Sequence, residues 1–263
     1  MLKGINIKSG INSSALKIMA MVLMLIDHIG ALIVLPYMMT VTDYELYQRL
    51  HSLYDILRLI GRVAMPIFVY QLVLGNRFTK NKSRHILNIL IFTLISEIPY
   101  NFLLSDSIID IKDQSIMWAL LLGALMMACL DLVNKEKVSI IYSTLIVLIT
   151  CVIAYFIRSD YGFSAIILIA SIYFLIDHRE LMIYISPVVF LLSYFLMKYM
   201  NPRYRDQAVE RLASEAMCVV AFIFIANDNG IRKGGKTLKW IGYLFYPLHL
   251  TIIYLIRRFI LKF

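Results

Sequence analysis

Nine polar residues stand inside or beside long apolar runs of this sequence, where they could do chemistry. A charged group at the centre of a bilayer costs about 2.5–3.5 kcal/mol, so such residues either pair with one another or serve a function. Imidazole and carboxylate groups can transfer protons, and cations can stabilise developing negative charge. The nine candidates are Lys17, Asp27, His28, Arg58, Arg62, Glu97, Asp160, Tyr246 and His249.

Lys17 and His28 are predicted to share one face of a helix. They are eleven positions apart, which at about 100° per residue is three turns plus about 20°, with a rise of roughly 16 Å. A cation near one membrane surface and an imidazole deeper in the helix could hold the two ends of an extended substrate with an anionic head. The spacing alone does not decide this, because many membrane helices carry Lys at their edge.

A polar stripe is formed by His51, Asp55, Arg58 and Arg62, which follow the spacing i, i+4, i+7, i+11. These positions lie on one face of a helix. For His51 and Asp55 a solvated amphipathic helix explains the pattern equally well. Arg62 is followed by apolar residues, which favours a buried role for its guanidinium.

Three prolines lie close to these polar side chains. Pro66 follows Arg62, Pro99 follows Glu97, and Pro247 precedes His249. A proline inside a helix kinks it and frees a carbonyl group. Irregular backbone beside polar groups is typical of a lined cavity in a membrane protein, although ordinary kinking is the alternative.

The composition excludes an ordinary soluble domain. Hydrophobic residues make up 60% of the 263 positions, charged residues 16%, and the mean hydropathy is +0.76, whereas soluble domains are about 25% charged. The apolar segments show no alternation, so we predict an all-α polytopic membrane protein rather than a barrel. About 20 residues cross a bilayer, which predicts one domain, residues 1–263, with about nine helices and a range of eight to ten. The predicted spans are 15–36, 57–76, 86–104, 115–133, 138–157, 163–178, 181–200, 209–226 and 239–260, with a tyrosine-rich connection at 37–54.

The net charge of +9 is spread over short connections, which indicates contact with lipid phosphates rather than nucleic acid. The positive-inside rule favours a cytoplasmic N-terminus in a bacterial-type plasma membrane, with 14 of the 26 Lys and Arg residues inside. The inner group is Lys3, Lys8, Lys17, Arg77, Lys80, Lys82, Arg84, Lys135, Lys137, Arg179, Arg232, Lys233, Lys236 and Lys239. Four cations oppose the rule: Lys198, Arg203, Arg205 and Arg211.

In this orientation several polar residues fall at one depth in the outer half of the membrane. They are His28, Arg62, Glu97, Arg158 and Asp160. Acids, bases and cations that meet in one layer can neutralise each other and form a buried site. The alternative is a set of ion pairs and interhelical hydrogen bonds without chemistry.

Three further features of the sequence give little indication of function. Cys129, Cys151 and Cys218 fall in apolar runs without the spacing of a metal site. The first apolar run lacks a small-x-small cleavage site and is expected to stay as an anchor. The basic loop 231–236 could touch a phosphate, but a loop on the inner surface needs no such role.

Five stretches together resemble the TraX family, membrane proteins associated with N-terminal acetylation of conjugative pilin. The stretches are LKIMAMVLMLIDHIG (16–30), LRLIGRVAMPIF (57–68), SEIPYN (96–101), DYG (160–162) and YPLHL (246–250). They occur in order from residue 15 to about residue 255, and the resemblance is weakest in 37–54 and 198–211. At a greater distance, Lys17 and His28 are similar to the basic residue and histidine of the first helix in the wider transmembrane acyltransferase superfamily.

This resemblance implies transfer of an acetyl group from cytoplasmic acetyl-CoA to an acceptor on the far side of the membrane. The acceptor is either a peptide N-terminal amine or a sugar, and no residue pattern selects between them. Two other classes stay open: a proton-coupled transporter, and a noncatalytic partner of an envelope assembly.

Roles follow for the nine candidates if the chain is an acetyltransferase. His28 is expected to act as the general base, with His249 as the second choice. Asp27 or Glu97 could orient His28 or share its proton, although Asp27 could pair with an arginine instead. The expected substrate-binding residues are Arg58, Arg62, Tyr246 and Asp160, and Lys17 is expected to bind the phosphates of CoA; no metal is expected.

Overall fold

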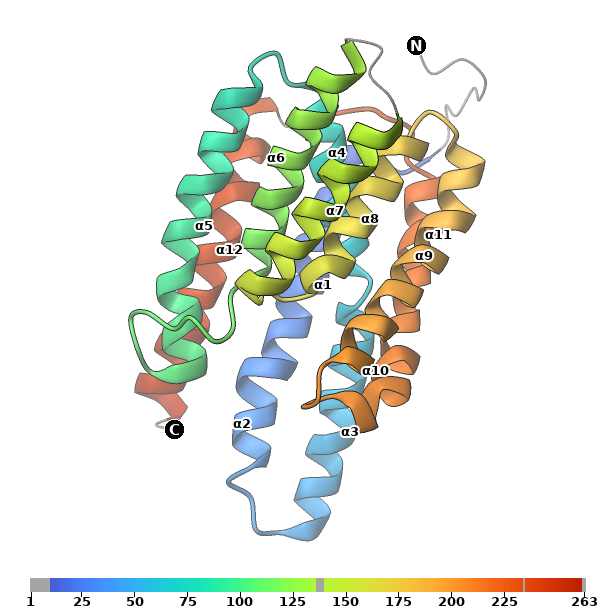
Figure 1. Cartoon of the computed structure of the whole chain (residues 1–263). Coiled ribbons are helices and arrows are strands. Elements are labelled where there is room, and N and C mark those ends of the chain that lie inside the picture. Colours follow the sequence, from blue (N-terminus) through green and yellow to red (C-terminus); the bar gives the residue numbers. More distant parts are fainter. Residues whose placement is uncertain (1–9, 136–139, 234, 262–263) are drawn as a thin grey trace.

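The computed structural model of the protein describes residues 10–135, 140–233 and 235–261, and these form an all-α bundle without strands (Figure 1). The helices are α1 (Ser13–Ile29), α2 (Leu35–Met38), α3 (Tyr44–Gly61), α4 (Ala64–Phe78), α5 (Lys82–Ser105), α6 (Ile116–Lys135), α7 (Ile140–Ile157), α8 (Gly162–Leu175), α9 (Arg179–Met200), α10 (Ala208–Glu215), α11 (Val219–Ala226) and α12 (Gly235–Leu255). A π-helical stretch, Gly30–Val34, joins α1 to α2, and another, Ile256–Leu261, follows α12.

The prediction of a polytopic helical membrane protein is confirmed. Seven of the described helices are long and apolar enough to cross a membrane. Helix α8 has only 14 residues, or roughly 21 Å at 1.5 Å per residue. The predicted span 209–226 is not one helix: α10 and α11 have eight residues each, separated by a 3₁₀ turn at Ala216–Cys218. The polar residues of α10 explain why this segment does not form a continuous apolar span.

The bundle has two different ends. The start of α1 lies at the same end as the α4–α5, α8–α9 and α11–α12 connections (Figure 1), and we call this the basic end. The opposite end, which we call the hairpin end, carries the α2–α3 connection and the end of α12. Connections that the charge analysis grouped together therefore lie together. Lys3, Lys8 and Lys137 of that analysis lie outside the described residues.

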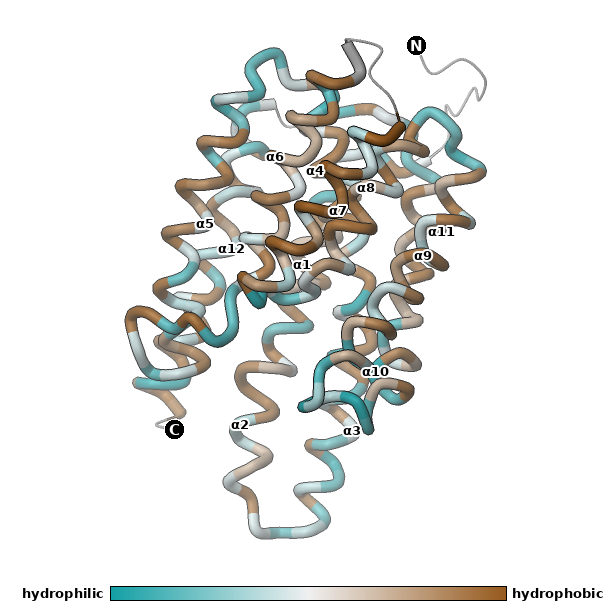
Figure 2. The backbone as a smooth tube through the Cα atoms, viewed as in Figure 1, coloured by the Kyte–Doolittle hydropathy of each residue, from teal (hydrophilic) through white to brown (hydrophobic). Residues whose placement is uncertain are grey.

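Helices α2 and α3 project beyond the rest of the bundle as a hairpin (Figure 1). The predicted connection at 37–54 is wrong, because α3 already begins at Tyr44. Asp43 caps α3: its side chain accepts a hydrogen bond of 2.8 Å from the Leu46 amide, as residues at this position commonly do. Hydrophilic residues along the projecting part of α3 (Figure 2) explain why hydropathy alone did not reveal it.

Helices α3 and α4 meet at a break at Arg62 and Val63. Pro66 has no amide hydrogen for the Arg62 carbonyl four residues earlier, so the regular helix is interrupted where the sequence predicted a kink. Pro99 and Pro247 behave differently, because α5 and α12 stay helical through them.

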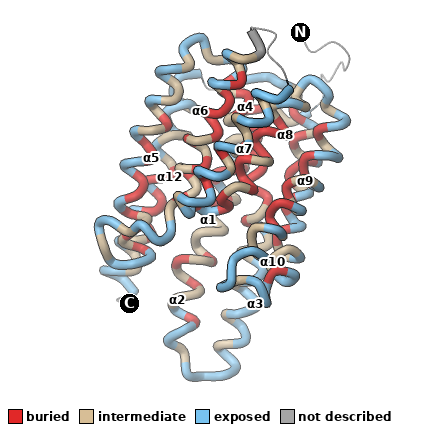
Figure 3. The backbone as a smooth tube through the Cα atoms, viewed as in Figure 1, coloured by how far each residue is buried: buried red, intermediate tan, exposed pale blue. Residues whose placement is uncertain are grey.

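Helices α4, α6 and α8 carry many of the buried residues (Figure 3). Ile67, Met127 and Ile169 are fully buried, one from each helix. Gly123 allows α6 to approach α8 closely, since a Cβ atom there would lie 2.3 Å from the Ile169 side chain. Helix α7 packs outside this core and is mostly exposed. The centre of the bundle is therefore closely packed and apolar.

Candidate functional site

One cavity of about 650 Å³ connects the basic end with the polar residues deeper in the bundle. Its walls come from α1, α3, α4, α5, α6, α12 and the α7–α8 turn. His249 and Glu97 do not line it. The predicted residues that do are Lys17, Asp27, His28, Arg58, Arg62, Asp160 and Tyr246.

Four cations line the cavity at the basic end, and we call them the basic mouth: Lys17, Arg232, Lys233 and Lys239. The carboxylates among the lining residues of the described chain, Asp27 and Asp160, belong to its other end. The charge of the basic mouth is therefore not neutralised inside the cavity. Such a group of cations can bind an anionic ligand.

Lys17 lies against the backbone of α12. A Cβ atom at Gly242 would be 2.3 Å from its Nζ atom, so a glycine is needed for this side-chain position. The neighbouring Arg232 stacks 4.0 Å from the centre of the Phe78 ring. Both cations thus have defined positions in the basic mouth.

A buried carboxylate holds the α11–α12 connection against the start of α1. Asp228 accepts hydrogen bonds from the Ser13 hydroxyl, at 2.8 and 2.9 Å, and from the Tyr70 hydroxyl at 2.9 Å. The amide of Gly230 donates to it as well, at 3.1 Å. Asp228 is not among the residues predicted from the sequence, and it fixes the connection that leads to Arg232 and Lys233.

Apolar side chains line the cavity between its two charged ends. They include Met24, Phe68, Leu72, Ile89 and Leu120. A passage of this kind accommodates the uncharged part of a ligand whose anionic part stays at the basic mouth.

His28 and His249 face each other at the deep end, with ring centres 4.8 Å apart. The Nδ1 atom of His28 lies 2.8 Å from the Met24 carbonyl, and that of His249 lies 2.7 Å from the Phe245 carbonyl. A carbonyl only accepts, so each Nδ1 donates its hydrogen and the neutral ring keeps a lone pair on Nε2. His28 lines the cavity, whereas His249 is buried behind it. His28 is therefore the imidazole that a ligand can reach.

Asp27 forms an ion pair with Arg58. The structure thus shows the predicted alternative, in which Asp27 pairs with an arginine. Among the described residues, Asp27 forms no hydrogen bond with His28 that would orient its ring. Both side chains are mostly buried and line the cavity. The pair joins α1 to α3 directly beside His28.

Arg62 connects three parts of the chain. It donates a hydrogen bond of 3.0 Å to the Tyr161 hydroxyl, and its Nε atom lies 3.3 Å from a carboxylate oxygen of Glu215. Glu215 is fully buried at the end of α10. Glu215 is not among the residues predicted from the sequence, although it is an acid inside the predicted span 209–226, as the other candidates are polar residues inside or beside apolar runs.

Glu97 contacts the start of α6. Its Oε1 atom accepts hydrogen bonds from the Ser115 amide and hydroxyl, at 3.2 and 2.5 Å. This contact stabilises the start of α6. Among the described residues Glu97 forms no hydrogen bond or ion pair with His28, so its expected action on His28 stays a prediction.

Two further predicted residues complete the deep end. Tyr246 is buried, with its ring centre 6.0 Å from His28 and 5.4 Å from His249. Asp160 lies in the α7–α8 turn, where its amide donates to the Gln114 carbonyl at 2.9 Å. The Asp160 carboxylate forms none of the ion pairs found in the described chain, and it faces the cavity.

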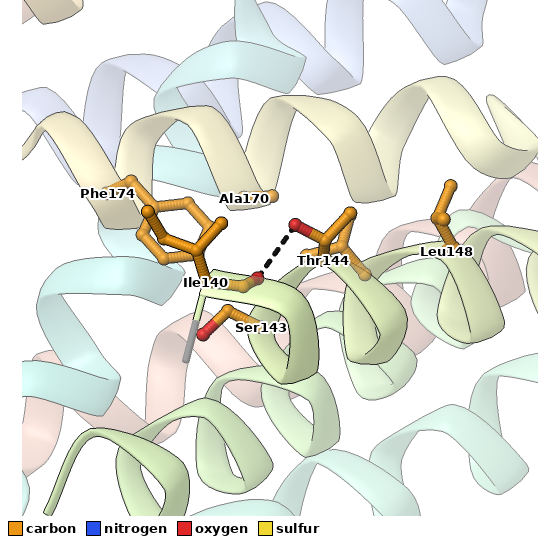
Figure 4. A pocket seen from close by; sticks show the side chains of 7 residues that line it. Ile140, Ser143, Thr144, Leu148, Ala170 and Phe174 are labelled. Atoms are coloured by element: carbon orange, nitrogen blue, oxygen red, sulfur yellow. Dashed lines mark hydrogen bonds between the residues drawn. The ribbon is translucent and has the colours of Figure 1, made fainter. Parts of the chain in front are cut away.

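A second cavity, of about 440 Å³, lies between α7 and α8 (Figure 4). Its lining is apolar except for Ser143 and Thr144, and the Thr144 hydroxyl already donates to the Ile140 carbonyl at 2.9 Å. None of the lining residues is titratable. The first cavity is therefore the candidate functional site.

The family model described as TraX protein matches residues 12–257. This range includes all the residues that line the first cavity. No curated protein and no solved structure matches the chain. The similarity of the first helix to the wider acyltransferase superfamily stays a prediction from Lys17 and His28.

Proposed function

Because the chain belongs to the TraX family, a family of pilin-processing membrane proteins, we propose that it transfers an acetyl group from acetyl-CoA to an acceptor. One observation carries the proposal: a single cavity joins the basic mouth to His28, whose Nε2 lone pair is available. An anionic donor would enter at the basic end and react at the deep end.

The donor would bind along the cavity in an extended form. The phosphates of CoA would contact Lys17, Lys239 and Arg232 in the basic mouth, where charge-assisted hydrogen bonds are strongest. The pantetheine arm would pass the apolar section and place the thioester near His28. The rise from Lys17 to His28 is roughly 16 Å along α1, so the donor would bind with its phosphates and its thioester well apart.

The chemical step needs a base at the acceptor. An amine or hydroxyl attacks the thioester carbonyl carbon, so a C–N or C–O bond forms and the C–S bond breaks. His28 Nε2 takes the proton of the acceptor and returns it to the thiolate that leaves, which yields CoA with a free thiol. The guanidinium of Arg58 or Arg62 would stabilise the negative charge on the carbonyl oxygen.

The acceptor would enter from the hairpin end, where Asp160 reaches the cavity. An unpaired carboxylate attracts an ammonium group, so this residue favours a peptide N-terminal amine over a neutral sugar. Tyr246 would contact the acceptor beside His28. In this arrangement the basic end is cytoplasmic, the membrane is a bacterial-type plasma membrane, and the chain starts inside.

The test compares His28→Ala with His51→Ala. His51 is exposed on α3 and pairs with Asp55 at 3.1 Å, so its loss controls for the removal of a histidine. Loss of a general base lowers the rate by about 10²–10⁴-fold. We therefore expect labelled acetate to pass from acetyl-CoA into envelope peptides or glycans with the wild type and His51→Ala, and to fall by at least that range with His28→Ala.

Three outcomes would contradict the proposal. Undiminished transfer by folded His28→Ala protein would exclude His28 as the base. Proton-driven solute flux in liposomes without CoA release would show a transporter, and tight binding of an envelope protein without CoA release would show an assembly partner. Mass spectrometry of envelope material from wild-type and deletion cells identifies the acceptor by its missing acetyl group.

A further inference from the structure

Four cations surround three tyrosines where α9 ends and α10 begins. Around the Tyr204 ring, Arg211 lies 4.5 Å from the centre, Lys198 lies 5.0 Å and Arg203 lies 5.7 Å. The set that we call the cation–tyrosine cluster is Lys198, Arg203, Arg205, Arg211, Tyr194, Tyr199 and Tyr204. The cluster lies at the hairpin end, in a strongly hydrophilic connection (Figure 2).

None of these cations forms an ion pair in the described part of the chain. Asp206 and Glu210 lie in the same segment, yet neither takes part in an ion pair in the described chain. Arg205 donates from Nε to the Tyr199 carbonyl at 3.2 Å, and Arg211 donates to the Gln207 side chain at 3.0 and 3.3 Å. Most guanidinium hydrogens of the cluster are therefore available for an external anion.

Exposed apolar side chains lead up to the cluster along one face of α9. Leu192, Leu196 and Tyr199 follow the spacing i, i+4, i+7 and are 65%, 50% and 52% exposed. Helix α9 is apolar and long enough to cross a membrane, and Arg205 lies over the Tyr199 ring, 5.7 Å from its centre. The surface thus combines an apolar stripe with cations at its end.

We propose that the cation–tyrosine cluster binds the phosphate of an anionic phospholipid, whose acyl chain lies along Leu192 and Leu196. Guanidinium groups bind phosphate oxygens through paired hydrogen bonds, and tyrosines are favoured at the depth of lipid headgroups. An acidic peptide would match the cations but would leave the apolar stripe without a role. Binding of this phosphate also explains why four cations lie on the predicted outer side of the membrane, against the positive-inside rule.

The test measures lipid retained by the purified full chain in detergent by native mass spectrometry. Phosphatidylglycerol is the anionic probe and phosphatidylcholine the neutral one. We expect the wild type to retain phosphatidylglycerol in preference to phosphatidylcholine. The affinity of the triple variant R203Q/R205Q/R211Q for phosphatidylglycerol should be at least about tenfold lower. The matched control is K80Q/R84Q/K236Q, which removes three exposed cations at the basic end and should retain the lipid as the wild type does.

A second variant separates the two parts of the lipid. Leu192→Ser with Leu196→Ser leaves the cations in place and should weaken phosphatidylglycerol binding, without changing binding of glycerol phosphate, which has no acyl chain. Equal lipid retention by the wild type and the triple variant would overturn the proposal. Glycerol phosphate binding as tight as lipid binding, or displacement by polyglutamate without lipid preference, would overturn it too. Acetyl transfer is not measured here, so failure leaves the proposed function untouched.

Discussion

The carboxylate of Asp27 lies directly against the backbone of Gly61. A Cβ atom at Gly61 would be 2.3 Å from both the Cβ and the Oδ1 atom of Asp27. This contact brings α1 and α3 together where Asp27 pairs with Arg58. The glycine therefore determines the geometry of the wall beside His28.

Gly61→Ala is expected to displace Asp27 and to separate it from Arg58. We expect acetyl transfer to fall at least about tenfold, which corresponds to about 1.4 kcal/mol. The control is Gly75→Ala, because the added Cβ would meet only His85, at 3.4 and 3.5 Å. Steady-state rates with acetyl-CoA check the prediction, and equal loss in both variants would contradict it.

Gly242→Ala is expected to act on donor binding. The new methyl group would take the position of the Lys17 ammonium, and this flexible side chain would move out of the basic mouth without unfolding the protein. We expect a raised KM for acetyl-CoA and an unchanged kcat, because the lost contact stabilises the bound substrate and the transition state equally. Lys17→Gln should behave alike, and Lys236→Gln, which does not line the cavity, should have no effect. A fall in kcat alone would contradict this role.

His249 is expected to act through His28 rather than on the substrate. It is buried behind His28 and fixes that ring by edge contact at 4.8 Å. His249→Ala should lower kcat less than His28→Ala does and should shift the pH profile of the reaction. The double variant should be no slower than His28→Ala, because residues that act as a unit are not additive. Additive losses would indicate independent roles.

Glu215→Gln is expected to destabilise the protein, because it leaves the Arg62 charge buried without its partner. Breaking a buried ion pair from one side costs about 3–5 kcal/mol. Arg62→Gln should be destabilising for the same reason, and the double variant Arg62→Gln/Glu215→Gln should be less destabilised than the two single effects predict. Thermal unfolding of the four proteins in detergent measures this coupling. Independent effects would show that the pair contributes little.

Periodicity and charge predicted much of the site. Lys17 and His28, which are predicted to share one helix face, both line one cavity. Depth did not predict the partner of Glu97, because depth along a helix does not say which neighbour a side chain faces. Ser115, which contacts Glu97, is 18 positions away in the sequence.

The missed residues have a common cause. Asp228 and Glu215 bind groups from distant parts of the chain, such as Ser13 and Arg62, and only the packing of the helices brings these together. The polar residues in the projecting part of α3 predict a connection, although Asp43 supplies a helix cap. Capping signals predict such a helix better than hydropathy does.

The ion pair between Arg77 and Asp177 should contribute little, and only above acidic pH. Arg77 donates hydrogen bonds of 2.9 and 2.5 Å that lower the pKa of Asp177. Such a group stabilises the fold above its unfolded pKa of about 3.9, and this stability is lost as the pH falls through the lower folded pKa. With side chains 39% and 60% exposed, the pair is worth less than about 1 kcal/mol. Asp177→Asn should lower the Tm slightly at pH 6 and progressively less below pH about 4. The control, Glu210→Gln, should leave the Tm unchanged at both pH values. A decrease in Tm of Asp177→Asn that becomes larger on acidification would contradict the prediction.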